Sequence, residues 1–129
     1  METKKFVAGK IKILVIDDEP SVVDAVKLIL NDNGYDTIVA LTGRDGIEAG
    51  KRTRFDVTIT DLRLPDMSGI DVLKWMRTND PSSRVILITS HSTPEVVKKA
   101  MNGGAIKVLP KPFSPEELIE LVTQALSVP

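Results

Sequence analysis

Short apolar runs alternate with longer amphipathic segments along most of the chain. The first run, residues 11–16, is apolar apart from Lys12 and leads into Asp17-Asp18-Glu19-Pro20. A short run rich in Ile and Val is typical of a buried strand. Apolar residues then recur at helical spacing from Val22 to Leu30, and Asn33-Gly34 ends that segment. The pattern repeats, and we predict strands at residues 11–16, 37–41, 55–60, 85–88 and 106–109.

Capping residues mark the starts of several predicted helices. Ser68 precedes the third helix, and Thr93-Pro94 begins the fourth. Ser114-Pro115-Glu116-Glu117 combines a capping box with a proline at the first helical position. The second helix, residues 43–53, is predicted to be weak, because Gly46 and Gly50 lower its helix propensity.

Five apolar strands with interleaved helices predict an α/β fold, in which a parallel sheet is covered on both faces. Residues 1–10 contain lysines and no apolar pattern, so we predict an N-terminal tail there and one domain over residues 11–129. The chain stops just after the last predicted helix, so we expect no further domain within it.

The amino-acid composition argues against several classes of function. The 129 residues carry 17 Lys plus Arg and 18 Asp plus Glu, and this balance argues against a nucleic-acid-binding module, which needs a concentrated basic face. Absence of Cys excludes a disulfide framework and a Cys-ligated zinc site. No apolar run reaches the roughly 20 residues of a membrane span, and residues 1–10 lack the apolar stretch of a signal peptide. We therefore expect a cytoplasmic protein that does not contact a membrane.

Polar residues follow four of the five predicted strands. In an open α/β sheet, ligands bind outside the carboxyl ends of the strands. If these four strands are neighbours, their polar groups converge at one edge of the sheet. The groups are Asp17, Asp18 and Glu19 after the first strand, Asp61 after the third, Thr89 and Ser90 after the fourth, and Lys111 after the fifth.

This mixture of groups is suited to phosphoryl transfer. Clustered carboxylates repel one another, and Mg²⁺ (or Mn²⁺) relieves that repulsion while keeping sites for phosphate oxygens. Such a cation and Lys111 would neutralise phosphoryl oxygens, and Thr89 would donate a hydrogen bond to one. Asp61 stands alone at its strand end, so we predict that it is the nucleophile and forms an aspartyl phosphate.

Four segments lie at the predicted strand ends. They are Ile13-Leu14-Val15-Ile16-Asp17-Asp18-Glu19-Pro20, Asp56-Val57-Thr58-Ile59-Thr60-Asp61-Leu62-Arg63-Leu64-Pro65-Asp66-Met67-Ser68-Gly69, Val85-Ile86-Leu87-Ile88-Thr89-Ser90-His91 and Lys111-Pro112-Phe113. Together and in this order they resemble the receiver domain of bacterial two-component response regulators, and the resemblance extends from about residue 10 to the end of the chain.

The resemblance implies a flavodoxin-like (βα)5 doubly wound sheet with strand order 2-1-3-4-5, formed by a receiver domain over residues 11–129. It implies that Asp61 accepts a phosphoryl group from a histidine kinase. Asp18 and Asp61 would ligate the metal directly and Asp17 through water, and the backbone carbonyl of Arg63 would complete the protein ligands.

Further roles come from the same resemblance. Thr89 matches the switch hydroxyl and Lys111 the phosphate-contacting lysine, and the bond from Lys111 to Pro112 would be cis. Arg63 and His91 match positions that tune the lifetime of the phosphoryl group. The chain departs from the family at Val108, where an aromatic switch residue is usual.

The implied partners are a sensor histidine kinase or phosphotransfer protein, and a downstream effector protein or a covalently linked output domain. A contact face on the last two helices and the fifth strand would respond to phosphorylation, with a homodimer through the last helices as one arrangement. The domain itself would not bind nucleic acid. It would be no enzyme, since it would catalyse only its own phosphorylation and dephosphorylation.

Other interpretations of these residues stay open at this point. Each could be structural by itself: Asp61 in a turn, the residues 17–19 at a helix N-terminus, Lys111 in solvent. One alternative is a receiver-like adaptor that works without phosphorylation. The acidic pair, Asp61, Thr89 and Lys111 argue against it, but Val108 keeps it open. Another is a haloacid-dehalogenase-like phosphatase, but that family needs a second Asp two residues after the nucleophile, where this chain has Arg63.

Overall fold

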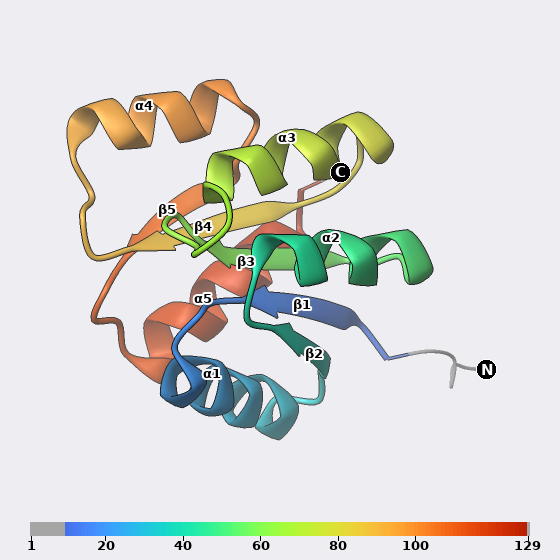
Figure 1. Ribbon diagram of the computed structural model, residues 1–129. Helices are drawn as coiled ribbons and strands as arrows, with labels where there is room; N and C mark the ends of the chain where they lie inside the picture. The colour runs from blue at the N-terminus through green and yellow to red at the C-terminus, as the bar shows by residue number, and fades with distance from the viewer. Residues whose placement is uncertain (1–9, 129) are drawn as a thin grey trace.

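Strands and helices alternate strictly through the chain. The computed structural model describes residues 10–128 (Figure 1). The elements are β1 Lys12–Ile16, α1 Pro20–Asp32, β2 Asp36–Ala40, α2 Gly43–Arg52, β3 Val57–Asp61, α3 Gly69–Asn79, β4 Val85–Thr89, α4 Pro94–Asn102, β5 Lys107–Pro110 and α5 Pro115–Leu126.

The five strands form one sheet in the order β2-β1-β3-β4-β5, and every neighbouring pair is parallel. At the end of β1, Ile16 pairs with Ala40 of β2 and with Thr60 of β3. Parallel strands need crossover connections, and here each crossover contains a helix. The predicted α/β class and the strand order 2-1-3-4-5 are confirmed.

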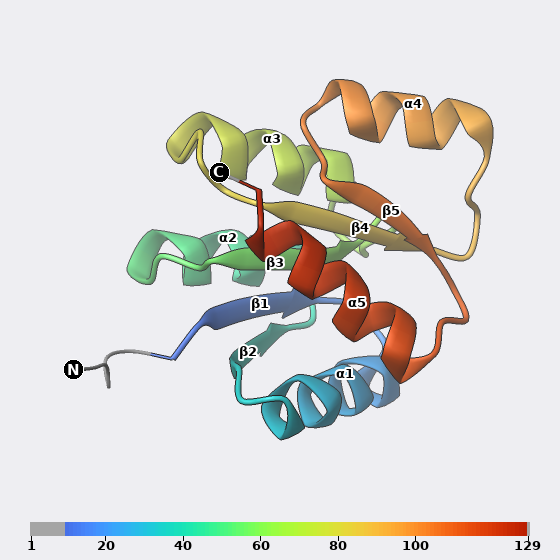
Figure 2. The same cartoon turned by 180° about the vertical axis from the view of Figure 1, so that it is seen from behind.

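Helices cover both faces of the sheet (Figures 1 and 2). One face carries α1 and α5, and the other carries α2, α3 and α4. Alternate residues of β1 supply the two cores: Ile13 and Val15 pack with α1 and α5, while Leu14 and Ile16 pack with residues from the other layer. All four are fully buried, and burial of one such side chain stabilises the fold by roughly 1.5–3 kcal/mol. The two-sided core explains why the strands are almost entirely apolar.

Strand boundaries differ from the predicted ones by one or two residues. The third strand was predicted to start at Phe55, but the ladder begins at Val57, which pairs with Ile13. Phe55 is nonetheless buried. Apolar character therefore marks burial, which extends beyond the residues that pair between strands.

The second helix forms in spite of its glycines. A side chain at Gly46 would overlap Ile16, so the glycine allows α2 to lie close against β1. The tertiary contact thus outweighs the low helix propensity. At the chain's beginning, residues 1–9 of the predicted tail lie outside the described residues. Within residues 10–128, no helix has the length and apolar character needed to cross a membrane.

Candidate functional site

The polar residues predicted to converge do lie at one edge of the sheet. Asp17 directly follows β1, Asp61 is the last residue of β3, Thr89 is the last residue of β4, and Lys111 directly follows β5. Because β1, β3, β4 and β5 are successive neighbours, their carboxyl ends bring these residues together.

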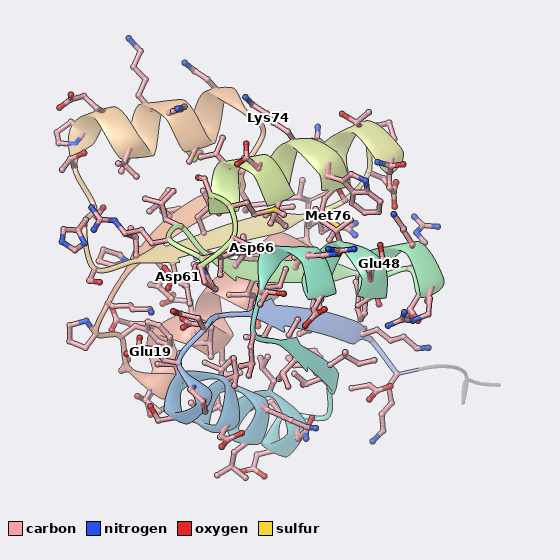
Figure 3. The ribbon with its side chains drawn as sticks, viewed as in Figure 1. Glu19, Glu48, Asp61, Asp66, Lys74 and Met76 are labelled. Carbon is pink, nitrogen blue, oxygen red and sulfur yellow. The ribbon has the colours of Figure 1, made fainter. Side chains whose placement is uncertain are left out.

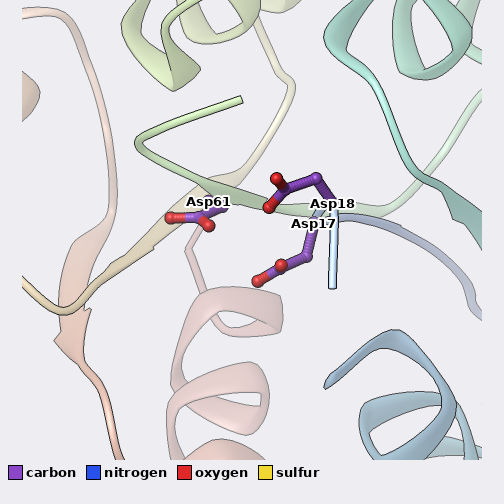
Figure 4. A group of neighbouring side chains, drawn as sticks. All are labelled: Asp17, Asp18 and Asp61. Atoms are coloured by element: carbon purple, nitrogen blue, oxygen red, sulfur yellow. The ribbon is translucent and has the colours of Figure 1, made fainter. Parts of the chain in front are cut away.

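Three aspartates form the centre of this edge (Figure 4). Carboxylate oxygens of Asp17, Asp18 and Asp61 lie within 4.8 Å of one another. Asp17 is fully buried, Asp61 is 7% exposed, and Asp18 is exposed. Asp17 Oδ1 accepts a hydrogen bond of 3.0 Å from the backbone N–H of Glu19. The start of the connection to α1 thereby orients the most buried carboxylate.

The ammonium of Lys111 lies among the carboxylates. Its Nζ is 2.7 Å from Asp17 Oδ2, 3.2 Å from Asp61 Oδ2 and 3.3 Å from Glu19 Oε1. The backbone N–H of Lys111 donates to the carbonyl of Thr89, and the Lys111–Pro112 peptide bond is cis. Three carboxylates thus contact one cation, and Asp18 lies beside two of them, so the site carries an excess of negative charge.

The pKa values of the site reflect this imbalance. Burial raises the pKa of Asp61, and the charge of Asp17 raises it further, although Lys111 acts in the opposite direction. For Lys111, burial by itself would lower the pKa. The hydrogen bond to Asp17 and the charges of Asp61 and Asp17 outweigh burial and raise the pKa above its ordinary value. Ionised Asp61 is therefore held at an electrostatic cost that an additional cation would relieve.

The chemistry of the donor set suits a hard divalent cation. Carboxylate oxygens from Asp17, Asp18 and Asp61 are close enough together to share one ion. Magnesium and manganese both prefer oxygen ligands of this kind. The acidic cluster could therefore hold a metal ion.

The remaining predicted residues surround this cluster. Thr89 is 1% exposed, and its Oγ1 accepts a hydrogen bond of 3.0 Å from the backbone N–H of His91. The backbone N–H of Arg63 donates to Asp61 Oδ1 at 3.3 Å. The side chains of Arg63 and His91 are exposed. Val108 is half-buried and packs against the core beside α2, α3 and α4, so an aliphatic side chain stands at the position where an aromatic switch residue is usual.

Two acidic residues near the site make contacts that the sequence did not predict. Glu19 appeared there only as the third member of an acidic run, but its side chain contacts Lys111. Asp66 was not singled out, yet it binds the backbone of α2. Figure 3 labels both residues together with Asp61. A carboxylate that follows Pro65 in a loop carries no signal of its partner, because the partner lies 23 residues away.

Comparison with known proteins identifies the family of the chain. The family model of the response regulator receiver domain matches residues 13–123. The chain belongs to the response regulator receiver domain family. It is thus a phosphorelay signalling module, and the members of this receiver family are not classical enzymes. The alternative of an adaptor that works without phosphorylation is not favoured.

Curated relatives are longer than this chain. The chain is 35% identical over 128 residues to the alginate biosynthesis transcriptional regulatory protein AlgB of Pseudomonas aeruginosa, covering 99% of this chain and 28% of that protein. It is 32% identical over 108 residues to the cell cycle transcriptional regulator CtrA of Caulobacter vibrioides, covering 84% of this chain and 47% of that protein. The chain spans less than half the length of these relatives.

Solved structures of receiver domains superpose over nearly the whole chain. A CheY-like receiver domain protein from Methanospirillum hungatei matches with a TM-score of 0.88 at 29% identity, covering 92% of this chain and 94% of the other. The BeF3-activated DrrB receiver domain matches with a TM-score of 0.85 at 32% identity, covering 93% of this chain and 100% of the other. These matches place the chain in the CheY-like group of flavodoxin-like folds.

Proposed function

We propose that the chain accepts a phosphoryl group on Asp61 in a reaction that depends on Mg²⁺ or Mn²⁺. One observation carries the proposal: Asp61 lies within reach of both Lys111 and the other two aspartates at the carboxyl edge of the sheet. A carboxylate between a fixed cation and a site for a second cation is suited to attack phosphorus, because phosphoryl transfer depends mainly on positioning and charge neutralisation.

In this mechanism an Asp61 carboxylate oxygen bonds to phosphorus, and the bond from phosphorus to the histidine nitrogen of the donor breaks. Ionised Asp61 needs no general base, since it carries no proton to remove. The ammonium of Lys111 binds a phosphoryl oxygen, and Thr89 donates its hydroxyl hydrogen to another. Asp18 and Asp61 would hold the metal directly, with Asp17 through water and the carbonyl of Arg63 as a further ligand. The bound metal would neutralise phosphoryl charge.

The state of Asp61 would be communicated through the neighbouring strand ends. Thr89 would move toward the phosphoryl group and carry the following loop with it, because its Oγ1 and the His91 N–H are hydrogen bonded. Val108 offers no aromatic ring to follow that movement. Arg63 and His91 extend from exposed positions beside the site, where they would set how fast water removes the phosphoryl group.

The phosphoryl donor would be a sensor histidine kinase or a phosphotransfer protein. The output would be an effector protein or a covalently linked output domain, contacted through α4, β5 and α5, with dimerisation through the same elements. These roles imply a cytoplasmic location and no direct contact of the domain with nucleic acid or membrane. The functional unit would be residues 11–129, with residues 1–10 as a tail.

The test uses acetyl phosphate as the donor and intact mass as the readout. Wild type incubated with Mg²⁺ should gain one phosphoryl group, and a chelator should prevent the gain. Asp61→Asn should gain none. Asp56→Asn is the matched control, since Asp56 is an exposed aspartate at the opposite edge of the sheet, and it should label like wild type. Labelling of Asp61→Asn would refute the assigned acceptor, and absence of any adduct despite bound Mg²⁺ would refute the proposed chemistry.

A further inference from the structure

The loop that follows Asp61 is tied to a helix from a different part of the chain. Asp66 Oδ1 accepts a hydrogen bond of 2.9 Å from the backbone N–H of Gly43, and its Oδ2 accepts one of 2.9 Å from that of Arg44. Both donors lie in the first turn of α2. Figure 3 shows Asp66 between the Asp61 end of β3 and the start of α2.

The first turn of α2 needs this acceptor. The leading backbone N–H groups of a helix have no partner within the helix, and they carry partial positive charge. The side chain of Thr42 accepts from the third of them, that of Asp45. Asp66 supplies acceptors for the first two. A single carboxylate from the loop therefore completes the N-terminal cap of α2.

The electrostatics of Asp66 fit this role. Its slight burial acts to raise the pKa, but the hydrogen bonds from Arg44 and Gly43 outweigh burial and lower the pKa below the ordinary value. The carboxylate thus stays ionised, which strengthens hydrogen bonds from backbone N–H groups.

The loop also packs closely against the start of α2, beside the two hydrogen bonds. A side chain at Gly43 would overlap the side chain of Met67, the residue after Asp66, so a larger residue there would force Met67 to shift. Met67 in turn packs against the core under α2 and α3. The tip of the loop is therefore held by two hydrogen bonds and an apolar contact.

The base of the loop is bonded to the sheet and to itself. The N–H of Leu62 donates to Ile88 of β4, and the N–H of Gly69 donates to Leu62. Arg63 lies opposite Ser68 in an isolated antiparallel bridge. Residues 62–68 thus form a short closed loop, fixed to the sheet at its base and to α2 at its tip by Asp66.

We propose that Asp66 is a positioning residue, which holds the 62–68 loop so that the backbone of Arg63 faces the acidic cluster in the geometry that metal binding requires. The inference rests on the proposed function, because Arg63 is a ligand only there. It extends that function by making the N-terminus of α2 part of the structure that supports the site. Outer partners of this kind orient metal ligands without touching the metal.

The first experiment measures the Mg²⁺ dissociation constant by calorimetry at fixed ionic strength. Asp66→Ala should weaken binding about tenfold, which is typical for loss of an outer partner of a metal ligand. Asp66→Asn keeps one acceptor oxygen and should fall between Asp66→Ala and wild type. Asp56→Ala is the control, because Asp56 also is exposed and accepts one backbone hydrogen bond, from Lys12 at the opposite edge. It should bind Mg²⁺ like wild type.

The second experiment measures amide hydrogen exchange. Coupling between two sites is reciprocal, so Mg²⁺ should slow exchange of the Gly43 and Arg44 amides in wild type. In Asp66→Ala that response should be absent. A mere helix cap would give a different result: Asp66→Ala would lower the melting temperature while Mg²⁺ affinity and the Mg²⁺ response of these amides stayed as in wild type. That result would overturn the inference.

Failure of the proposed function would be recognised separately. If wild type bound no Mg²⁺, the metal site would be refuted, and exchange in metal-free protein would then decide the role of Asp66. The N–H groups of Leu64 and Gly69 are bonded within the loop. Faster exchange at both in Asp66→Ala but not in Asp56→Ala would support a loop held by Asp66, and equal exchange would overturn it.

Discussion

Charged side chains are exposed at one end of the sheet and partly buried at the other. At the amino end, a pocket of about 440 Å³ is walled by Phe55, Trp75 and Met76 and rimmed by charged residues. There Lys51 is 3.0 Å from Glu48 and Arg54 is 3.3 Å from Asp80, each pair at the surface.

At the carboxyl end, by contrast, Asp17 and Asp61 are buried and share Lys111 with exposed Glu19. Exposed pairs contribute little to stability, whereas buried charges are costly unless each is compensated. The two ion pairs at the amino end are thus exposed to solvent, whereas at the carboxyl end Asp17, Asp61 and Glu19 share the single cation of Lys111. That deficit of positive charge indicates a site built to receive a ligand.

The largest difference between the two ends should appear when Lys111 is removed. Lys111→Ala leaves Asp17, which is fully buried, without its cation, and loss of one partner of a buried ion pair costs roughly 3 kcal/mol. Urea denaturation of the metal-free protein measures the loss. Lys107→Ala, at the start of β5 and exposed, should leave stability nearly unchanged. Equal stability of Lys111→Ala and wild type would contradict this prediction.

Mg²⁺ should stabilise the carboxyl end by mass action. A ligand that binds only the folded state contributes about 2.7 kcal/mol at about 100 times its dissociation constant. Thermal denaturation with Mg²⁺ and with chelator, at matched ionic strength, gives this difference. Asp18→Ala should abolish most of the gain without a large cost of its own, because Asp18 is exposed. A gain that persisted in Asp18→Ala would place the metal elsewhere.

Neutralising Asp61 should stabilise the metal-free protein, in contrast to the usual effect of mutating a buried residue. The raised pKa means that folded protein binds this proton more tightly than unfolded chain does. Stability therefore falls as pH rises from the ordinary carboxyl range through the raised pKa. Asp61→Asn removes that loss, so its melting temperature in chelator should exceed that of wild type at pH 7, and the two should converge at lower pH. A lower melting temperature at pH 7 would contradict this prediction.

The smallest effect should come from the amino end. Arg54→Ala breaks the surface ion pair with Asp80. Because the Arg54 side chain is 79% exposed, the substitution should lower the free energy of unfolding by less than about 0.5 kcal/mol. The loss should shrink further at high salt, since exposed charges are screened. Urea denaturation at two salt concentrations tests both points. A loss as large as that of Lys111→Ala would remove the contrast between the two ends.

Much of this protein was predictable from local sequence. Apolar runs located all five strands, and Pro, Gly and capping residues located the helices, because these signals act within a few residues. The polar residues that end four strands, Asp61 among them, could be assigned to one edge of the sheet once the fold class was known.

Tertiary structure decided what depends on residues far apart in the chain. The sequence shows an acidic run that includes Glu19, but the contact of Glu19 with Lys111 joins positions 92 residues apart. Asp66 similarly meets Gly43 only because the sheet brings the start of α2 beside the 62–68 loop. Residue type determines from which donors a carboxylate can accept a hydrogen bond. Strand order determines which of those donors lie within hydrogen-bonding distance.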